Sequence, residues 1–435
     1  MFLSKKHTDT SRFKAVFKKK ISLSTYFPSG TQFYYGYPAG EDSGFLNGDT
    51  SPKTSELFAA RAYSCAGSKV SVVGYASSRY PVIPQGVFDK LCVPNLLSSQ
   101  AIILPKKITS SYETHVRNKL IKKALMKTIS PGMLVMAQPF IDESMSEIFQ
   151  IPSQLTFWLN DKNNMRDYIM EALLPKRHGT YRNGLEFEKE YKKLSLPVVI
   201  KASSSAGGDG VFICSTKADL LNAVSKLSSI SGTILAEQYI KDIKNYAIHF
   251  GIPADGRRPI DILGVNEQLT TPDGEFVGGI IRSTTIPKVL EQSVAHLREV
   301  ILPHVRSMGW HGIGGFDVLI DEKGLAYYID CNFRMTGMSA YHFMVANNEI
   351  TEPLVAITGR FNGGSEEFES TMYPYAGSKS SDRFLQIVAM TRHKDAWQFN
   401  ASLSFSSEAE LMTRARMLLG CGVESHALRL ISKGI

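Results

Sequence analysis

The chain has 435 residues, of which 43% are hydrophobic and 21% are charged. This is the composition of a globular protein, and the length predicts about two or three domains. No apolar run reaches the length of about 18 residues that a membrane span needs. The five cysteines are scattered without the paired spacing of a disulfide frame or a zinc site. We therefore expect reduced thiols, a cytoplasmic location and no membrane partner.

The N-terminal segment carries most of the excess positive charge. The formal net charge is +8, and before residue 21 a single acid, Asp9, opposes Lys5, Lys6, Arg12, Lys14, Lys18, Lys19 and Lys20. This segment lacks the apolar core of a secretory signal, and its many lysines are unlike a transit peptide. We expect residues 1–25 to form a solvated, partly disordered basic arm, and we expect no nucleic-acid surface.

Residues 26–155 are expected to form an α/β domain. Short apolar runs at 69–76, 101–105 and 133–140 predict buried strands, and helical periodicity predicts helices at 55–66 and 112–129. This alternation indicates an open, mostly parallel sheet. No Gly-x-Gly-x-x-Gly follows a strand, so a dinucleotide site is not supported. The segment 34–48 belongs either to a substrate cleft or to a surface loop, and its glycines are Gly36, Gly40 and Gly44.

Residues 160–174 have an apolar stripe at helical spacing before Pro175. This pattern predicts a helix that Asn160 or Asp161 caps. Lys162 lies in its first turn, where a cation opposes the helix dipole. A stabilising role is therefore disfavoured, which leaves an incidental surface position or ligand binding.

A loop of small residues follows the predicted strand 197–201, which ends in Lys201. The loop reads Ala-Ser-Ser-Ser-Ala-Gly-Gly-Asp-Gly at 202–210, and a second strand is expected at 211–213. Small residues let backbone N–H groups approach an anion closely, and Lys201 adds a charge beside them. The Walker sequence is absent. We interpret the segment as phosphate-binding in preference to a mobile hairpin tip.

The next elements form an alternation of helices and strands. A capped helix at 216–227 precedes a strand at 233–240 that carries Glu237 near its end. Further strands are expected at 246–252, at 260–268 and at 275–283, where Arg282 is close to the strand end, and a helix is expected at 287–308.

Residues 314–337 predict a β-hairpin with acidic side chains. Two strand-like runs flank the polar turn 321–324, and pairing across this turn would set Asp317 opposite Tyr328. Asp330 and Asn332 would then share one face with Asp317, because side chains alternate along a strand. Oxygen ligands of this kind suit Mg²⁺, and Arg334 would point into the same site. The alternative is that the acids only face solvent on an exposed hairpin.

Taken together, these features resemble the ATP-grasp superfamily of carboxylate–amine and carboxylate–thiol ligases. The resemblance rests on a fixed order: a lysine at a helix start, a strand-end lysine with a small-residue loop, Glu-x-x-Ile, and an acidic hairpin that closes on Asp-x-Asn-x-Arg. It covers roughly residues 155–345. It implies an ATP-grasp fold, with two antiparallel sheets clasping ATP, for residues 156–365, and a small cap or subunit contact for 366–435. The expected fold class is therefore α/β, with an α+β catalytic part.

The resemblance also implies a role for each residue of these motifs. The ATP phosphates would be held by Lys162, Lys201, Ser205, Gly207, Gly208 and Gly210. The adenine and ribose would meet Glu237, Ile240 and Asn245, with Glu237 and Ile240 in the segment whose backbone meets adenine. Mg²⁺, or Mn²⁺ in its place, would be bound by Asp317, Asp330 and Asn332. The reacting acyl group would face Arg334, with Arg282 as a second candidate whose alternative is a surface arginine. Superfamily members more often have glutamate at both acidic positions, so the aspartates here are shorter by one methylene.

The implied activity is formation of an amide bond. An amino-acid or peptide carboxylate would become an acyl phosphate, and an amine would then displace the phosphate, releasing ADP. The layout is most similar to standalone peptide and amino-acid ligases of natural-product pathways, of the pheganomycin peptide ligase type. A thiol or hydroxyl acceptor, or a nucleotide-binding regulatory protein without turnover, are the alternatives. The expected partners are thus small-molecule or peptide substrates, and a homodimer is compatible with the resemblance.

Overall fold

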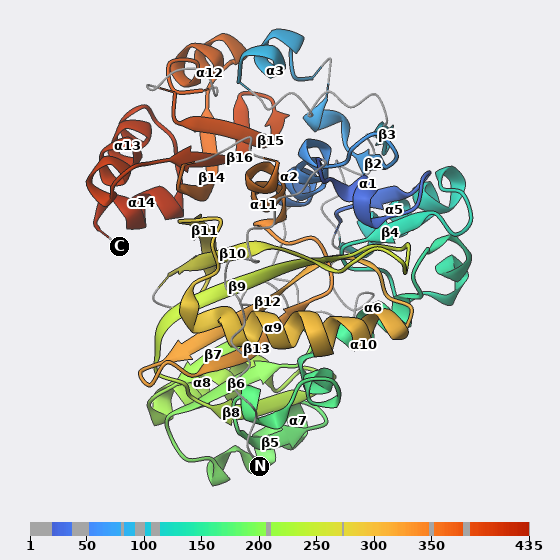
Figure 1. The fold of residues 1–435 in the computed structure, drawn as a ribbon, viewed down its shortest axis with the longest axis vertical. Coiled ribbons are helices and arrows are strands. Elements are labelled where there is room, and N and C mark those ends of the chain that lie inside the picture. The colour runs from blue at the N-terminus through green and yellow to red at the C-terminus, as the bar shows by residue number, and fades with distance from the viewer. Residues whose placement is uncertain are drawn as a thin grey trace.

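Three β-sheets organise the described part of the chain (Figure 1). The computed structural model describes residues 20–36, 52–79, 82–91, 101–105, 114–205, 210–271, 274–347, 352–376 and 383–434. Most of the basic arm, Gly40, Gly44, Gly207 and Gly208 lie outside these ranges. Within them, no helix is both long enough and apolar enough to cross a membrane.

The N-terminal sheet is parallel, as the sequence predicted. Its strands are arranged in the order β3-β2-β1-β4, and each neighbouring pair is parallel. Their bounds are β1 (Gln32–Tyr34), β2 (Ser71–Gly74), β3 (Ala101–Ile103) and β4 (Leu134–Met136). The accompanying helices are α1 (Leu23–Tyr26), α2 (Pro52–Arg61), α3 (Gln85–Leu91) and α5 (Thr114–Thr128). The central strand β1 is missing from the sequence-based strands, because three residues are too few for a periodic pattern.

The second sheet is antiparallel, with the order β5-β8-β6-β7. It contains β5 (Arg177–Tyr181), β6 (Val198–Ala202), β7 (Val211–Cys214) and β8 (Ile234–Gln238), and α7 (Gly184–Glu190) and α8 (Lys217–Leu227) accompany it. The predicted helix cap is present, because Thr216 and Asp219 form a reciprocal capping box at the start of α8. Apolar side chains from both helices and from the strands form the core of this layer. We call it the clasp sheet.

The third sheet has eight strands in the order β13-β12-β9-β10-β11-β14-β16-β15. The strands are β9 (Asp242–Ile252), β10 (Asp261–Thr270), β11 (Phe276–Ile281), β12 (Gly312–Asp321), β13 (Ala326–Asn332), β14 (Leu354–Asn362), β15 (Leu385–His393) and β16 (Ala396–Ser404). A helical segment packs on one face of this sheet (Figure 1). The sequence predicts one helix there, and the structure divides it into a 3₁₀ turn (Lys288–Leu290), α9 (Glu291–His296), a π turn (Leu297–Ile301) and α10 (Leu302–Ser307).

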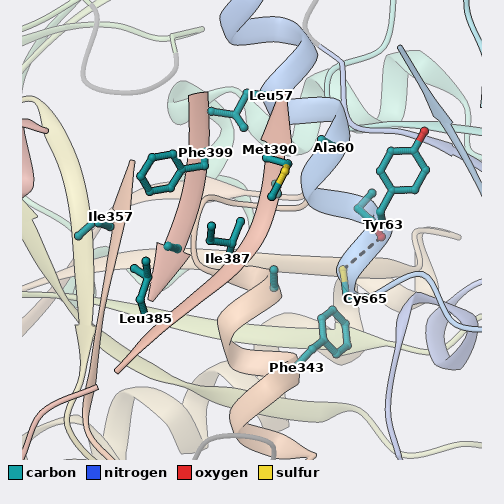
Figure 2. Packing of buried hydrophobic residues seen from close by; sticks show 14 of the residues in the cluster. Leu57, Ala60, Tyr63, Cys65, Phe343, Ile357, Leu385, Ile387, Met390 and Phe399 are labelled. Carbon is teal, nitrogen blue, oxygen red and sulfur yellow. Dashed lines mark hydrogen bonds between the residues drawn. The ribbon is translucent and has the colours of Figure 1, made fainter. Parts of the chain in front are cut away.

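The C-terminal residues extend this sheet, which the sequence did not predict. The expected boundary at residue 365 does not interrupt it, since β14 pairs with β16 along their whole length and β16 pairs with β15. Helices α11 (Ser339–Ala346), α12 (Ser365–Met372), α13 (Glu408–Gly420) and α14 (His426–Ser432) complete the region. Figure 2 shows Leu57 of α2 beside Met390 and Phe399, and these residues belong to one core cluster together with Ala60 and Leu385. The C-terminal hairpin therefore shares a core with the N-terminal domain.

The continuous helix predicted at 160–174 is wrong. Helix α6 (Ser153–Asn160) ends where that helix was expected to begin, and short 3₁₀ helices follow at Lys162–Asp167 and Glu171–Leu173. Tertiary hydrogen bonds account for the break: the N–H of Lys162 donates to the carbonyl of Ser203 at 3.0 Å, and Asn160 Oδ1 accepts the N–H of Phe333 at 2.9 Å. Bonds to neighbouring segments thus outweigh the local helical pattern.

Candidate active site

The acidic hairpin of β12 and β13 places two carboxylates directly opposite each other. Asp317 pairs with Asp330, whereas Val318 pairs with Tyr328, so a β-bulge at Ile329 lies between these positions. The predicted pairing of Asp317 with Tyr328 is therefore wrong by two residues: the turn shifts the register by one, so that Val318 faces Tyr328, and the bulge shifts it by one more. In the structure the two acids are direct cross-strand partners, whereas the predicted register made them diagonal neighbours. They share one face of the sheet.

The electrostatics of Asp317 reflect this arrangement. Burial, followed by the charge of Asp330, raises the pKa of Asp317 to about 7, while Arg334 and Lys162 act in the opposite direction. Two opposed carboxylates repel each other, so a bound cation would stabilise them. An exposed hairpin that only faces solvent gives no reason for such a pKa.

Lys162 lies beside this pair and is almost completely buried. Its Nζ contacts Asp330 Oδ1 at 3.1 Å and donates to the carbonyl oxygen of Ser205 at 3.0 Å and to its Oγ at 3.3 Å. The hydroxyl of Ser203 donates to Asp161 Oδ2 at 3.1 Å. The start of the small-residue loop is therefore attached to the segment that carries Lys162.

Lys201 reaches from the clasp sheet to the hairpin. Its Nζ contacts Glu237 Oε2 at 3.0 Å and donates to the carbonyl of Ile329 at 3.2 Å. Ile329 is the bulged residue, and its backbone carbonyl is thereby directed to Lys201. The two lysines that the sequence singled out thus approach the acidic hairpin from different elements.

Arg177 completes a buried ion cluster that sequence reasoning missed. Its Nη2 contacts Glu237 Oε1 at 2.9 Å, and its Nη1 donates to Asn163 Oδ1 at 2.8 Å. Burial alone would raise the pKa of Glu237, but Lys201 and Arg177 together outweigh burial, and the pKa lies below its usual value. We call Lys201, Glu237 and Arg177 the clasp triad. Arg177 belongs to no recognisable motif, and only its pairing with Glu237 across β5 and β8 reveals it.

The remaining predicted nucleotide residues lie around the two sheets. Asn245 on β9 has a buried Oδ1 without a hydrogen-bond partner, and it pairs with Leu319 of the hairpin strand β12. Ile240 is buried between β8 and β9. Gly210 has φ +71°, a conformation that glycine adopts without strain, and its carbonyl accepts the N–H of Ala202 at 2.8 Å.

The two predicted arginines have different surroundings. Arg334 follows the hairpin, lines a pocket and influences Asp317 electrostatically. Arg282 instead forms ion pairs with Glu267 at 2.9 Å and with Glu408 of α13. Among the described residues, no contact joins Arg282 to the acidic pair.

Two buried histidines lie next to the acidic face and were not anticipated. The Nε2 atoms of His249 and His342 lie 2.8 and 3.1 Å from the same oxygen, Oδ1 of Asn266. Burial lowers the pKa of His249 to about 4, and burial together with His249 lowers the pKa of His342 well below its usual value, so both rings are neutral. Because an amide oxygen only accepts hydrogen bonds, each Nε2 is assigned as the donor to Asn266. Gly315, opposite Asn332 on the hairpin, is also opposite His249 on β9.

The donor set fits a magnesium ion that binds together with phosphates. Asp317 and Asp330 supply carboxylates, and Asn332, which follows on β13, supplies an amide oxygen. In the described residues, no group of three or more His, Cys, Asp or Glu side chains could form an all-protein metal site. Mg²⁺ commonly binds through one or two carboxylates and completes its octahedron with waters and substrate phosphates.

Comparisons with known proteins identify the fold. Residues 175–332 match the family model "L-aspartate--L-methionine ligase, ATP grasp". The 2-oxoglutarate carboxylase small subunit of Hydrogenobacter thermophilus is 24% identical over 237 residues, covering 48% of this chain and 48% of that protein. Phosphoribosylamine–glycine ligase of Ralstonia nicotianae is 26% identical over 182 residues, covering 37% of this chain and 42% of its own length.

A solved structure extends the likeness to most of the chain. The biotin carboxylase of Campylobacter jejuni, solved as a β,γ-ATP complex, superposes with a TM-score of 0.55 at 13% identity, covering 93% of this chain and 95% of that one. The chain therefore has the ATP-grasp fold, as predicted. It spans about half the length of the curated relatives it matches.

Proposed function

We propose that the protein is an ATP- and Mg²⁺-dependent ligase that activates a carboxylate as an acyl phosphate and joins it to an amine, releasing ADP and phosphate. The observation that carries this proposal is that Lys162 contacts Asp330 and Lys201 contacts the carbonyl of Ile329, in the hairpin where Asp317 and Asp330 are opposed. Lys201 belongs to the clasp sheet, Lys162 to the segment after α6, and the two acids to the eight-stranded sheet. The ATP-grasp fold supports the same reading.

Different residues would bind the phosphates, the ribose and the metal ion of the nucleotide complex. Lys162 and Lys201 would neutralise the phosphates, the small-residue loop would contact them through its backbone, and the free Oδ1 of Asn245 would meet the ribose. Asp317, Asp330 and Asn332 would hold Mg²⁺, which supplies charge neutralisation at the phosphates. Arg334 would orient the carboxylate for transfer of the γ-phosphoryl group. This division relies on positioning and electrostatics, which carry most of the catalysis in phosphoryl transfer.

A carboxylate needs such activation because its oxygen is a poor leaving group. Phosphorylation converts that oxygen into part of a stable phosphate, and the lone pair of the amine nitrogen then attacks the acyl carbon. The C–O bond to phosphate breaks, and the nitrogen loses a proton. The atoms balance as one ATP consumed and one ADP, one phosphate and one amide formed.

We further propose that the product is a peptide or similar amide of an amino acid. The matched family model is named for a ligase of L-aspartate and L-methionine, and one relative is named as a ligase of phosphoribosylamine and glycine. A standalone peptide ligase of a natural-product pathway remains our narrower prediction. Carboxylases are among the relatives, which makes bicarbonate the acid to exclude first.

The decisive experiment follows the nucleotide product. Purified protein is incubated with ATP, Mg²⁺ and pooled acids and amines, including bicarbonate, and the spent reaction is separated by chromatography. We expect ADP in step with a condensation product, and hydroxylamine should trap the activated acid as a hydroxamate. AMP formed in step with product would contradict the acyl-phosphate route.

Two outcomes separate the alternatives. A hydroxamate without any amide, but with a thioester or ester, would indicate a thiol or hydroxyl acceptor. Binding of ATP without ADP formation under any acid would favour a regulatory nucleotide-binding protein.

A further inference from the structure

Arg61 is an arginine of the N-terminal domain that the proposed reaction has not yet used. It is the last residue of α2, and it is half-buried. Its Nε donates to Asn400 Oδ1 of β16 at 2.8 Å, and among the described residues no carboxylate pairs with its guanidinium. A partly desolvated cation without a carboxylate is unfavourable for the fold by itself, whereas an anionic ligand would compensate its charge.

The guanidinium of Arg61 is held in a fixed orientation. Its Cζ lies 4.4 Å from the ring centroid of Phe58 and 5.9 Å from that of Tyr35. Asn400, which accepts from Nε, is 3% exposed and donates through Nδ2 to Thr358 Oγ1 at 2.8 Å. Two rings and a buried amide therefore orient the guanidinium, and within the described part of the chain no acceptor meets its two Nη atoms.

The Nη end of Arg61 reaches the segment that follows the acidic hairpin. A methyl group on Gly337 would lie 3.6 Å from Arg61 Nη1 and 3.3 Å from Phe276 Cε1. Gly337 is three residues beyond Arg334, so the Cα atoms of these two residues are at most about 10 Å apart. Arg61 therefore meets the backbone close to the arginine that we propose for the reacting carboxylate.

Arg61 approaches this segment from the side opposite the proposed nucleotide. In Figure 1, α2 and the clasp sheet lie on opposite sides of strands β9 to β12. The clasp sheet supplies Lys201 for the phosphates, so the phosphoryl group would be on that side of the activated acid. An anion at Arg61 thus belongs to the substrate that arrives from the side of the N-terminal domain, which is the amine and not ATP.

We propose that Arg61 binds a carboxylate of the amine acceptor, while Arg334 binds the carboxylate that becomes the acyl phosphate. The acceptor class is then an amino acid or short peptide with a free carboxylate near its amine. This inference rests on the proposed function, because it identifies the second substrate of the same reaction. Tyr35, at the start of the segment 34–48, then contributes to a substrate cleft and not to a surface loop.

The first test uses the unaltered protein and acceptors that differ in one charge. Each amino acid that gives a condensation product with ATP, Mg²⁺ and the pooled acids is compared with its own primary amide, for example leucine with leucinamide. We expect kcat/KM for the amino acid to exceed that for its amide by about 10-fold to 100-fold, the range for losing hydrogen bonds between two charged groups. Equal values for the two acceptors would overturn the assignment.

The second test removes the guanidinium. Arg61→Met keeps an unbranched apolar stem beside Phe58, and it should abolish most of the preference for the amino acid over its amide. Hydroxamate formation should change by less than about threefold, since hydroxylamine has no carboxylate for Arg61 to bind. Arg61→Lys keeps the charge but loses the fixed orientation, so its preference should be intermediate. A preference that persists in folded Arg61→Met would overturn the proposal.

Arg383 offers a matched control. It is also half-buried, and its Cζ lies 4.8 Å from the ring centroid of Tyr373, so it forms a second contact between an arginine and an aromatic ring. Arg383→Met should leave the preference for the amino acid over its amide unchanged, and thermal unfolding of both methionine variants reports any loss of stability separately. An equal loss of preference in the two variants would overturn a specific role of Arg61.

The two levels of the hypothesis fail in different ways. If no acid supports ADP or hydroxamate formation, the proposed ligase function fails, and the assignment of Arg61 fails with it. If Arg61→Met lowers hydroxamate formation as strongly as amide formation, the ligase function stands and the assignment of Arg61 to the acceptor is wrong.

Discussion

The two sides of the candidate nucleotide site hold their charges in opposite ways. On the clasp sheet, Glu237 lies between Lys201 and Arg177, and these cations keep its pKa low. On the hairpin, Asp317 opposes Asp330, and its pKa rises to about 7. The first arrangement compensates its charges within the protein. The second has like charges in register, and Asp330 forms an ion pair with Lys162.

This difference indicates that the clasp triad has a structural role and that the acidic hairpin takes part in the reaction. An opposite-charge triad is stable by itself, and breaking it leaves an uncompensated buried charge. Opposed carboxylates oppose folding at neutral pH, so their retention is best explained by a ligand that they bind. We therefore expect substitutions in the triad to act through the position of Lys201, and substitutions in the hairpin to act on turnover directly.

The largest expected effect follows loss of a hairpin carboxylate. Asp330→Asn removes a proposed metal ligand and the partner of Lys162 while it preserves shape. Turnover should fall by about 100-fold to 1,000-fold, the range for losing one group that stabilises developing charge. Initial rates of ADP formation at saturating ATP measure it.

A control in the same hairpin distinguishes chemistry from folding. Asp321 accepts backbone N–H bonds from Lys323 and Leu325 at 2.9 and 2.8 Å, so it stabilises the turn. Asp321→Asn should reduce thermal stability slightly and leave turnover within about threefold, because it is remote from the acidic pair. Near-normal turnover of Asp330→Asn would remove the hairpin from the proposed metal site.

The next effect concerns the clasp triad. Arg177→Gln should raise KM for ATP by about tenfold and destabilise the fold by about 3 kcal/mol, since it leaves Glu237 with one cation in a buried position. Arg177→Lys keeps a charge but loses the two-pronged contact with Glu237 and Asn163, so it should be intermediate. Steady-state kinetics and thermal unfolding measure both quantities.

Arg182 offers a matched comparison, because it follows the same strand and its side chain is 88% exposed in a pair with Glu186. Arg182→Gln should change KM and stability very little. If the Arg177 and Arg182 variants behave alike, the triad does not position the nucleotide site.

At Asp317 we expect a smaller change in stability than at Arg177, and the substitution should stabilise the fold. Asp317→Asn should lower turnover by no more than Asp330→Asn does, and it should raise the melting temperature by about 1 °C at pH 8 without Mg²⁺, equivalent to about 1 kcal/mol. The pKa of Asp317 is raised in the folded state, so its contribution to stability is present at low pH and is lost as pH rises through about 7. The difference between wild type and variant should therefore shrink on acidification toward pH 5. Scanning calorimetry in chelator at pH 5 and pH 8 checks this, and a variant less stable at pH 8 would contradict it.

Local patterns were sufficient to predict most residues of the candidate site. A strand-end lysine followed by small residues, and alternating acids on a hairpin, are visible in a few consecutive residues, and the structure brings Lys162, Lys201, Asp317 and Asp330 together. The parallel N-terminal sheet was visible for the same reason, since buried strands are short apolar runs.

Contacts between distant segments could not be read in this way. The bulge at Ile329 has no local signal, and it is accompanied by a bond from Lys201, 128 residues away in sequence. Nothing in the local sequence distinguishes Arg177 from the other arginines, and only the pairing of β5 with β8 sets it opposite Glu237. The helix expected at 160–174 does not form, because the N–H of Lys162 bonds to the carbonyl of Ser203. The C-terminal strands were assigned to a cap because helix α12 separates them in sequence from their partner β14. In each case a tertiary bond decides what a local propensity leaves open.

The smallest expected effect is at Arg282, which the sequence offered as a second catalytic arginine. Its guanidinium pairs with Glu267 and with Glu408, and its side chain is 41% exposed. Exposed ion pairs contribute at most about 1 kcal/mol, so Arg282→Ala should leave turnover within about threefold and lower stability slightly. Arg334→Ala should instead reduce kcat/KM for the acid by at least about 100-fold, because it removes the guanidinium that we propose to bind the carboxylate. Measuring both variants with the same acid ranks the two arginines. A loss at Arg282 as large as at Arg334 would mean that its pair with Glu267 opens during turnover and that the sequence-based assignment was right.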